Sequence, residues 1–236
     1  MMGGELLRDL LLMGLCYGYI VSLILVSGAM GALLNVSRKA SRKFLHAMIG
    51  NLPFVIPLFT MSLAPFLVAA PFIVVTFIAS PYSPFDGVRR RLGRLSDLTE
   101  EGHHIGLILY AISYTVLAFF FPSKPWVIAA GVLPMAYGDS AAALVGERYG
   151  KTRLGFVGDK SLEGSLAMFA ASFVSLSLSL FFFSPIYGFA VAEKIIPALI
   201  VAVVVTLVEL LSPKGVDNLT VPLMGALTFL LADGWI

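Results

Sequence analysis

The chain has 236 residues, of which 58% are hydrophobic and only 13% charged, and its mean hydropathy is +0.93. Soluble domains carry about 25% charged residues, so this composition excludes an ordinary soluble protein and indicates a polytopic membrane protein. The formal net charge of +2 is small and spread along the chain, which argues against a nucleic-acid partner.

Apolar segments of membrane-spanning length recur along the chain. The first, residues 10–34, has no small-residue cleavage site, so we expect a retained helix and not a signal peptide. Further segments follow at residues 45–61, 65–80, 105–121, 126–146, 165–187, 194–211 and 219–236. Because an open sheet cannot satisfy its backbone in lipid, they predict an all-α fold of about eight transmembrane helices. Four prolines interrupt residues 45–80, which form either two spans or a re-entrant hairpin.

The distribution of basic residues predicts the orientation. Of the 16 Lys and Arg residues, 13 fall on one side of the predicted membrane, and only Arg8, Lys124 and Lys194 fall on the other. The positive-inside rule places the side with the 13 basic residues in the cytoplasm and both termini on the non-cytoplasmic side. The longest polar connection, residues 81–104, is too short to bury its own core, so we expect one membrane domain over residues 1–236. We interpret this connection as a cytoplasmic interfacial loop whose arginines contact anionic lipid headgroups.

The most informative polar residue is Asp139, in the cytoplasmic half of segment 126–146. Ionisable groups inside a membrane are costly and mark functional sites. Ala142, Ala143 and Gly146 recur at helical spacing after it, which permits close helix packing around the carboxylate. The alternative is a purely structural pairing of Asp139 with a basic side chain of a neighbouring helix.

A second polar cluster, Lys160-Ser161-Leu162-Glu163-Gly164-Ser165, stands at the predicted start of the next span. Unpaired backbone amides and the helix dipole favour an anion there. Lysines can neutralise phosphate oxygens while carboxylates hold Mg²⁺. We therefore expect a phosphate site at the cytoplasmic face. Helix capping and interfacial snorkelling are the alternative explanation of the same residues.

Two smaller clusters are predicted on the same side. Arg42, Lys43 and His46 stand at the entry to the second span, with Arg42 and His46 one helical turn apart. Glu209 ends the seventh span, and Asp217-Asn218 precedes the eighth. A positive-inside flank and an Asx-turn are the respective alternatives. We expect no zinc site, because the chain has one cysteine and no His-x-x-x-His spacing.

Five motifs in order resemble the integral-membrane lipid-alcohol kinases that use CTP, a family that includes phytol kinase, dolichol or polyprenol kinase and the CTP-dependent diacylglycerol kinase. The motifs are Arg42-Lys43-x-x-His46, Glu101 to Gly106, Gly138 to Lys151, Lys160 to Ser165, and Glu209 to Pro222. The resemblance implies transfer of the terminal phosphate of CTP, with Mg²⁺, to the hydroxyl of a membrane lipid alcohol such as dolichol, polyprenol, phytol or geranylgeraniol. The motifs do not distinguish among these acceptors or between CTP and other nucleotide donors, and they leave the oligomeric state open.

The resemblance also implies roles for single residues. Asp139, Lys160 and Glu163 are the expected catalytic residues, and Asp139, Glu163 and Asp217 the expected metal ligands. The residues expected to bind the nucleotide are Arg42, Lys43, His46, Gly150, Lys151, Ser161, Ser165 and Asn218. Both Asp139 and His46 are candidates for the group that accepts the hydroxyl proton.

Two other functions compete with the kinase. A CTP-dependent lipid cytidylyltransferase has a similar Gly-Asp helix end, but that family carries a C-terminal His-Gly-Gly element, and residues 209–217 contain no histidine. A lipid or anion transporter would place charges near the bilayer midplane and show a repeat between its halves. The polar residues instead gather at one face, so we favour the kinase.

Overall fold

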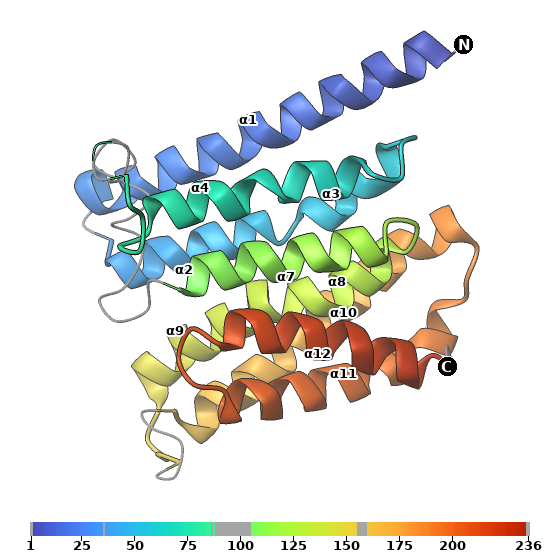
Figure 1. Ribbon diagram of the computed structural model, residues 1–236. Helices are drawn as coiled ribbons and strands as arrows, with labels where there is room; N and C mark the ends of the chain where they lie inside the picture. Colours follow the sequence, from blue (N-terminus) through green and yellow to red (C-terminus); the bar gives the residue numbers. More distant parts are fainter. Residues whose placement is uncertain (1, 35, 86, 88–104, 155–159, 235–236) are drawn as a thin grey trace.

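The computed structural model describes residues 2–34, 36–85, 87, 105–154 and 160–234, which form helices running back and forth between two ends of a bundle (Figure 1). This confirms the predicted all-α class. In chain order the elements are α1 (Met2–Leu34), α2 (Arg38–Ile49), the 3₁₀-helix η1 (Leu52–Leu58), α3 (Ala64–Ala69), α4 (Pro71–Ala79), α7 (Gly106–Phe120), α8 (Pro125–Leu133), the π-helix η2 (Pro134–Gly138), α9 (Asp139–Tyr149), α10 (Leu162–Tyr187), α11 (Val191–Leu211) and α12 (Asp217–Ala232).

Four helices in the described part of the chain are long and apolar enough to cross a membrane: Gly4–Met30, Pro125–Tyr149, Leu162–Tyr187 and Val191–Leu211. Shorter apolar helices cover Ala64–Ala79, Gly106–Phe120 and Asp217–Ala232. Such helices are typical of a membrane protein. The expected total of about eight spans remains a prediction.

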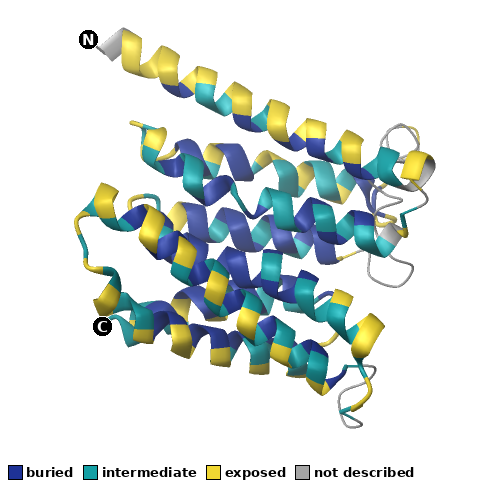
Figure 2. Cartoon of the chain, turned by 180° about the vertical axis from the view of Figure 1, so that it is seen from behind, coloured by how far each residue is buried: buried dark blue, intermediate teal, exposed yellow. Residues whose placement is uncertain are grey.

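The continuous helix α8–η2–α9 lies at the centre of the bundle. Residues 127–136 are all buried, and Figure 2 shows dark blue concentrated in the middle of the molecule. The peripheral helix α1, in contrast, has mostly exposed residues over its first half. α8 approaches α12 closely because both helices carry glycine at the contact: a Cβ on Gly225 would lie 3.2 Å from the Cα of Gly131.

A π-helical turn lies directly before Asp139. Pro134 has no N–H to continue the α-helical ladder, and the backbone N–H of Asp139 donates to the carbonyl of Pro134, five residues earlier. Single π-turns inside helices are frequent at functional sites. Here the turn ends at the carboxylate that the sequence singled out.

Prolines define the boundaries in residues 45–80. Pro53, Pro65 and Pro71 occupy the first turns of η1, α3 and α4, where a missing N–H removes no helical hydrogen bond. The chain reverses between η1 and α3, so that α4 returns beside α2 (Figure 1). Whether residues 45–80 make two spans or a re-entrant hairpin stays a prediction.

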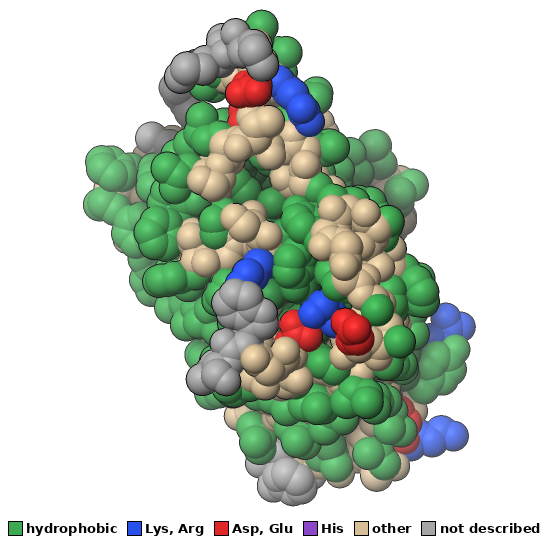
Figure 3. All heavy atoms as spheres, turned by 90° about the vertical axis from the view of Figure 1, so that its right-hand side faces the viewer, with side chains coloured by type: hydrophobic (Ala, Val, Ile, Leu, Met, Phe, Trp, Pro, Cys, Tyr) green, Lys and Arg blue, Asp and Glu red, His purple; other side chains and the backbone are tan. Residues whose placement is uncertain are grey.

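The two ends of the bundle differ in character. Both termini lie at the same end (Figure 1), and a view onto that end shows a largely apolar surface with few charged side chains (Figure 3). The opposite end carries the starts of α2, α7, α10 and α12 and the ends of α9 and α11. Most of the predicted interfacial loop lies outside the described residues. The part left out is residues 88–104, which include Glu101, His103 and His104.

Candidate active site

A pocket of about 460 Å³ opens at the end of the bundle opposite the termini. Helix ends far apart in the sequence contribute to it: the start of α2, the start of α7, α9, the start of α10, the end of α11 and the start of α12. Among its lining residues, six are Lys or Arg and four are Asp or Glu. These charged residues are Lys39, Arg42, Lys43, Arg153, Lys160, Lys214, Asp139, Glu147, Glu209 and Asp217.

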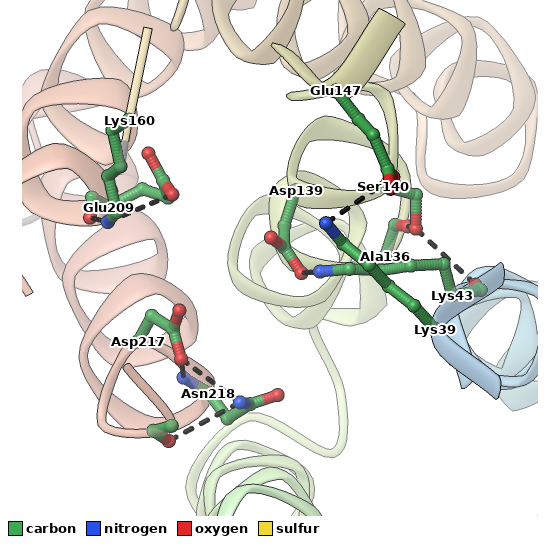
Figure 4. A network of polar contacts seen from close by, with 11 residues as sticks. Lys39, Lys43, Ala136, Asp139, Ser140, Glu147, Lys160, Glu209, Asp217 and Asn218 are labelled. Atoms are coloured by element: carbon green, nitrogen blue, oxygen red, sulfur yellow. Dashed lines mark hydrogen bonds and ion pairs between the residues drawn. The ribbon is translucent and has the colours of Figure 1, made fainter. Parts of the chain in front are cut away.

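Three carboxylates meet inside this pocket. Asp139 comes from α9, Glu209 from α11 and Asp217 from α12, and one oxygen of each lies within 4.8 Å of the others. Figure 4 shows the three side chains approaching the shared space from their separate helices. Asp139 is 6% exposed and Glu209 7% exposed, so two of the three negative charges are held away from water. We call these residues the acidic triad.

Each member of the acidic triad has a nearby hydrogen-bond donor. Lys43 forms an ion pair with Asp139. The ammonium of Lys160 lies 3.0 Å from Oε1 of Glu209 and also donates to the backbone carbonyl of that residue. Asp217 accepts from the backbone N–H and the side-chain amide of Asn218, at 2.9 and 3.0 Å. Buried carboxylates require such partners, because an unpaired buried charge is strongly destabilising.

Local contacts fix the helix that carries Asp139. The hydroxyl of Ser140 donates to the carbonyl of Ala136 at 2.6 Å and contacts the carbonyl of Lys43 at 3.3 Å, which ties α9 to α2. On the other side α9 meets α10 through glycines: a Cβ on Gly146 would lie 3.6 Å from the Cα of Gly164. The small-residue stripe predicted after Asp139 therefore does provide a close helix contact.

The start of α10 is closed by hydrogen bonds of its own. Ser161 caps the helix by accepting from the N–H of Gly164 at 3.2 Å, and the N–H of Ser165 donates to the carbonyl of Ser161. The N–H of Leu162 donates to the carbonyl of Thr152. The expectation that unpaired amides of this helix hold a phosphate is therefore wrong for Gly164, which the cap satisfies, and for Leu162, which bonds to the preceding connection. The lysines of the pocket remain as anion-binding groups.

Several known proteins with similar sequences are kinases. Phytol kinase of Synechocystis sp. is 41% identical over 141 residues, which are 58% of this chain and 59% of that protein. A probable chloroplastic phytol kinase of Triticum aestivum is 30% identical over 212 residues, which are 84% of this chain and 69% of the relative. The chain belongs to the phytol kinase family.

The similar proteins also include a kinase that is named for another prenyl alcohol. Chloroplastic farnesol kinase of Arabidopsis thaliana is 30% identical over 155 residues, 61% of this chain and 50% of that protein. The chain spans roughly half to two thirds of the length of several of these relatives. No family model and no solved structure matches it. The predicted kinase family is thus confirmed for its phytol and farnesol kinase branch.

The pocket brings together most of the residues that the sequence analysis predicted to be catalytic, metal-binding or nucleotide-binding. Nine of them line it: Arg42, Lys43, His46, Asp139, Lys160, Ser161, Ser165, Asp217 and Asn218. Asp139 and Lys160 line the same pocket. They are linked through Glu209, which belongs to the acidic triad with Asp139 and pairs with the ammonium of Lys160.

Three predicted residues are not among those lining the pocket. The carboxylate of Glu163 accepts from the backbone N–H of Thr152 at 3.2 and 3.3 Å, so it fastens the connection between α9 and α10 and does not join the acidic triad. Gly150 ends α9, with its N–H donating to the carbonyl of Gly146 at 3.1 Å. Lys151 is exposed on the same connection.

Glu209 takes the place in the triad that sequence reasoning gave to Glu163. The sequence placed Glu209 at the start of the last motif without a metal-binding role. The sequence did contain a signal for it, because Glu209 is the one charged residue in the C-terminal half of a 21-residue helix.

The donor chemistry of the acidic triad suits a magnesium ion. Mg²⁺ prefers carboxylate and other hard oxygen ligands, and the triad offers three carboxylates from three rigid helices. The side-chain oxygen of Asn218 is buried beside Asp217 without a hydrogen-bond partner in the described part of the chain. The residues present therefore fit the metal that the motif resemblance implies.

Proposed function

We propose that the protein is a CTP-dependent kinase that phosphorylates the hydroxyl of a membrane prenyl alcohol. The observation that carries the proposal is the meeting of the acidic triad with six basic side chains in one pocket of a phytol kinase family member. CTP as the donor rests on the motif resemblance. The printed activities of the relatives, phytol and farnesol kinase, support an isoprenoid acceptor.

The pocket has the capacity and charge for a nucleoside triphosphate. Its volume of about 460 Å³ falls within the roughly 300–1,000 Å³ common for small-molecule sites. Basic side chains from α2, the α9–α10 connection and the α11–α12 connection surround it, so several can contact phosphate oxygens at once. We assign Arg42, Lys160 and Lys214 to this binding.

The acidic triad would hold Mg²⁺ in this site. Bound Mg²⁺ neutralises the charge that builds up on the phosphates during phosphoryl transfer. Lys43 and Lys160 keep Asp139 and Glu209 oriented toward the shared space through their ion pairs. Positioning and charge neutralisation supply most of the rate in phosphoryl transfer, so a rigid arrangement of this kind matches the chemistry.

In the proposed reaction the oxygen of the acceptor hydroxyl attacks the terminal phosphorus of CTP. The new bond joins that oxygen to phosphorus, the bond to the bridging oxygen breaks, and CDP leaves. The hydroxyl proton passes to a group of the protein and then to water. Asp139 and His46 both line the pocket as candidates for that group.

We further propose that the pocket faces the cytoplasm. The basic connections that the positive-inside rule assigns to the cytoplasm include those bearing Lys39, Arg153 and Lys214, and these residues line the pocket. CTP would enter from the cytoplasm while the amphiphilic acceptor stays in the membrane with its hydroxyl at headgroup level. Neither substrate then needs to cross the bilayer.

A substrate panel tests the proposal. Purified protein with Mg²⁺ is assayed with phytol, farnesol, geranylgeraniol, dolichol, polyprenol and diacylglycerol, each with CTP, ATP, GTP and UTP. We expect a phosphorylated prenyl alcohol with CTP, and loss of this product in Asp139→Asn protein that elutes and melts like the unaltered protein. Absence of phosphorylated prenyl alcohol under every combination, or full activity of Asp139→Asn, would refute the proposal.

A further inference from the structure

An apolar groove begins where the polar pocket ends. It has a volume of about 60 Å³, and its lining comes from α1, α2, η1, the α3–α4 segment and α7, including Leu45, Ile49, Phe72, Ala111 and Tyr114. Leu107, near the start of α7, lines both the groove and the polar pocket. The two spaces therefore adjoin at α7.

An aromatic stack stands at this junction. His46 lines the polar pocket, Tyr110 lines the groove, and their rings are stacked with centroids 4.7 Å apart and planes 17° apart. Both side chains are buried, at 3% and 4% exposure. The pair forms a wall between a charged space and a hydrocarbon-like one.

The stack carries polar atoms that have no partner in the described part of the chain. Neither ring nitrogen of His46 makes a hydrogen bond there, and neither does the hydroxyl of Tyr110. Buried polar groups in folded proteins are almost always hydrogen-bonded, so such orphans call for a ligand or an ordered water. A ligand at this position needs a hydroxyl or similar group at one end and an apolar body beside it.

We propose that this junction is the acceptor subsite of the kinase, an inference that rests on the proposed function. The alcohol places its hydroxyl against His46 and Tyr110, and the first branched part of its tail fills the groove between α2, α4 and α7. The hydroxyl then lies at the edge of the space that contains Asp139. The remainder of the tail continues into the surrounding lipid.

The size of the groove limits what it recognises. A cavity of roughly 150 Å³ in a protein core binds benzene, so in proportion about 60 Å³ accommodates on the order of two or three carbons, such as the methyl-branched part of one isoprene unit. Selection therefore acts on the branching near the hydroxyl and not on total tail length. Burial of one methyl group corresponds to roughly fourfold in affinity. We expect farnesol, geranylgeraniol and phytol to have similar KM values, and an unbranched alcohol of equal length a higher one.

Photo-crosslinking tests the subsite directly. Full-length protein in detergent is labelled with a farnesol analogue that carries a diazirine on its first isoprene unit, and the labelled peptides are mapped by mass spectrometry. We expect label in peptides from α2, α4 and α7. Label chiefly on the lipid-facing sides of α10 and α11 would overturn the proposal, and this map requires no variant.

A matched pair of variants sharpens the test. Ala111→Leu adds three carbons inside the groove, whereas Ala170→Leu makes the same change on an exposed position of α10. We expect labelling to fall at least fivefold in the first and to stay within twofold in the second, when both elute as the unaltered protein does. Equal labelling of the two variants would contradict the assigned groove.

The aromatic stack has its own variants. His46→Phe keeps the ring stack and removes the hydrogen-bonding nitrogens, whereas His46→Gln keeps a hydrogen-bonding group. We expect the KM for the alcohol to rise at least tenfold in His46→Phe, by more than the KM for CTP rises, with partial recovery in His46→Gln. An unchanged alcohol KM in His46→Phe would overturn the role of the stack.

The experiments also separate this proposal from the proposed function. Label in the groove without phosphate transfer by the unaltered protein would refute the kinase activity and support the alcohol subsite. Phosphate transfer with label elsewhere would refute the subsite and leave the kinase activity standing.

Discussion

Glu209 offers the sharpest test of the acidic triad, because its role comes from the structure. Glu209→Gln preserves the shape of the side chain and removes one negative charge from the three that meet within 4.8 Å. Lys160 keeps its hydrogen bond to the backbone carbonyl of residue 209, so the lysine should stay near its present position. The substitution therefore changes the charge of the site more than its geometry.

The structure sets the expected size of the effect. Loss of one preorganised electrostatic group in an active site lowers turnover by about 10²–10³-fold. Glu147 provides a matched control, since it also lines the pocket but its side chain is 64% exposed and 3.4 Å from Lys39. An exposed ion pair is worth at most about 1 kcal/mol, which corresponds to roughly fivefold. Glu147→Gln should thus remain within about fivefold of the unaltered protein.

The assay measures phosphorylated prenyl alcohol as a function of Mg²⁺ concentration. We expect Glu209→Gln to lose at least about 100-fold in turnover and to need more Mg²⁺ for half-maximal rate, whereas Glu147→Gln keeps its Mg²⁺ dependence. Thermal melting in detergent verifies that both variants are folded. Similar losses in the two variants, or full activity in Glu209→Gln, would refute the triad.

Two further pairs of substitutions separate chemistry from stability. Lys160→Met should lower turnover by about 10²-fold. Lys194 lies about 22 Å from Glu209 along α11, so Lys194→Met, which breaks a 2.7 Å ion pair with Asp233, should lower the melting temperature and leave the KM for CTP unchanged. Equal loss of turnover in both variants would contradict the assignment. Gly164→Ala places a Cβ 3.0 Å from the carbonyl of Ala142 and should destabilise the protein by about 1–3 kcal/mol, whereas Gly14→Ala meets nothing within 4 Å and should be neutral or stabilising. Thermal melting checks the glycine pair, and an unaltered melting temperature for Gly164→Ala would show that the contact between α9 and α10 is not tight.

The helices themselves were largely predictable from the sequence. Apolar segments 105–121 and 126–146 correspond to Gly106–Phe120 and to the continuous helix from Pro125 to Tyr149. Hydropathy is a local property that membrane helices must obey, so their positions can be read without knowledge of the tertiary structure. The π-turn at residues 134–138 was not predicted, because its form depends on packing around Pro134 as well as on the proline itself.

The site was predicted as a set of residues but not as an arrangement. Asp139 and Lys160 were identified because ionisable groups in a membrane-embedded chain are costly, and Asp217 through the motif resemblance. Glu163 was preferred to Glu209 wrongly as a triad member, because the direction of a carboxylate depends on how its helix is rotated within the bundle. That rotation is fixed by contacts distant in sequence, such as the one between Gly131 and Gly225.

The central claim is that one pocket transfers the terminal phosphate of CTP to a prenyl alcohol. Incubation with CTP labelled at either the α- or the γ-phosphorus, in the presence of Mg²⁺ and farnesol or phytol, tests it most directly. We expect the γ-label in the lipid, the α-label in released CDP, and neither transfer in Asp139→Asn. Transfer of the α-label to the lipid with release of pyrophosphate would identify a cytidylyltransferase and contradict the kinase.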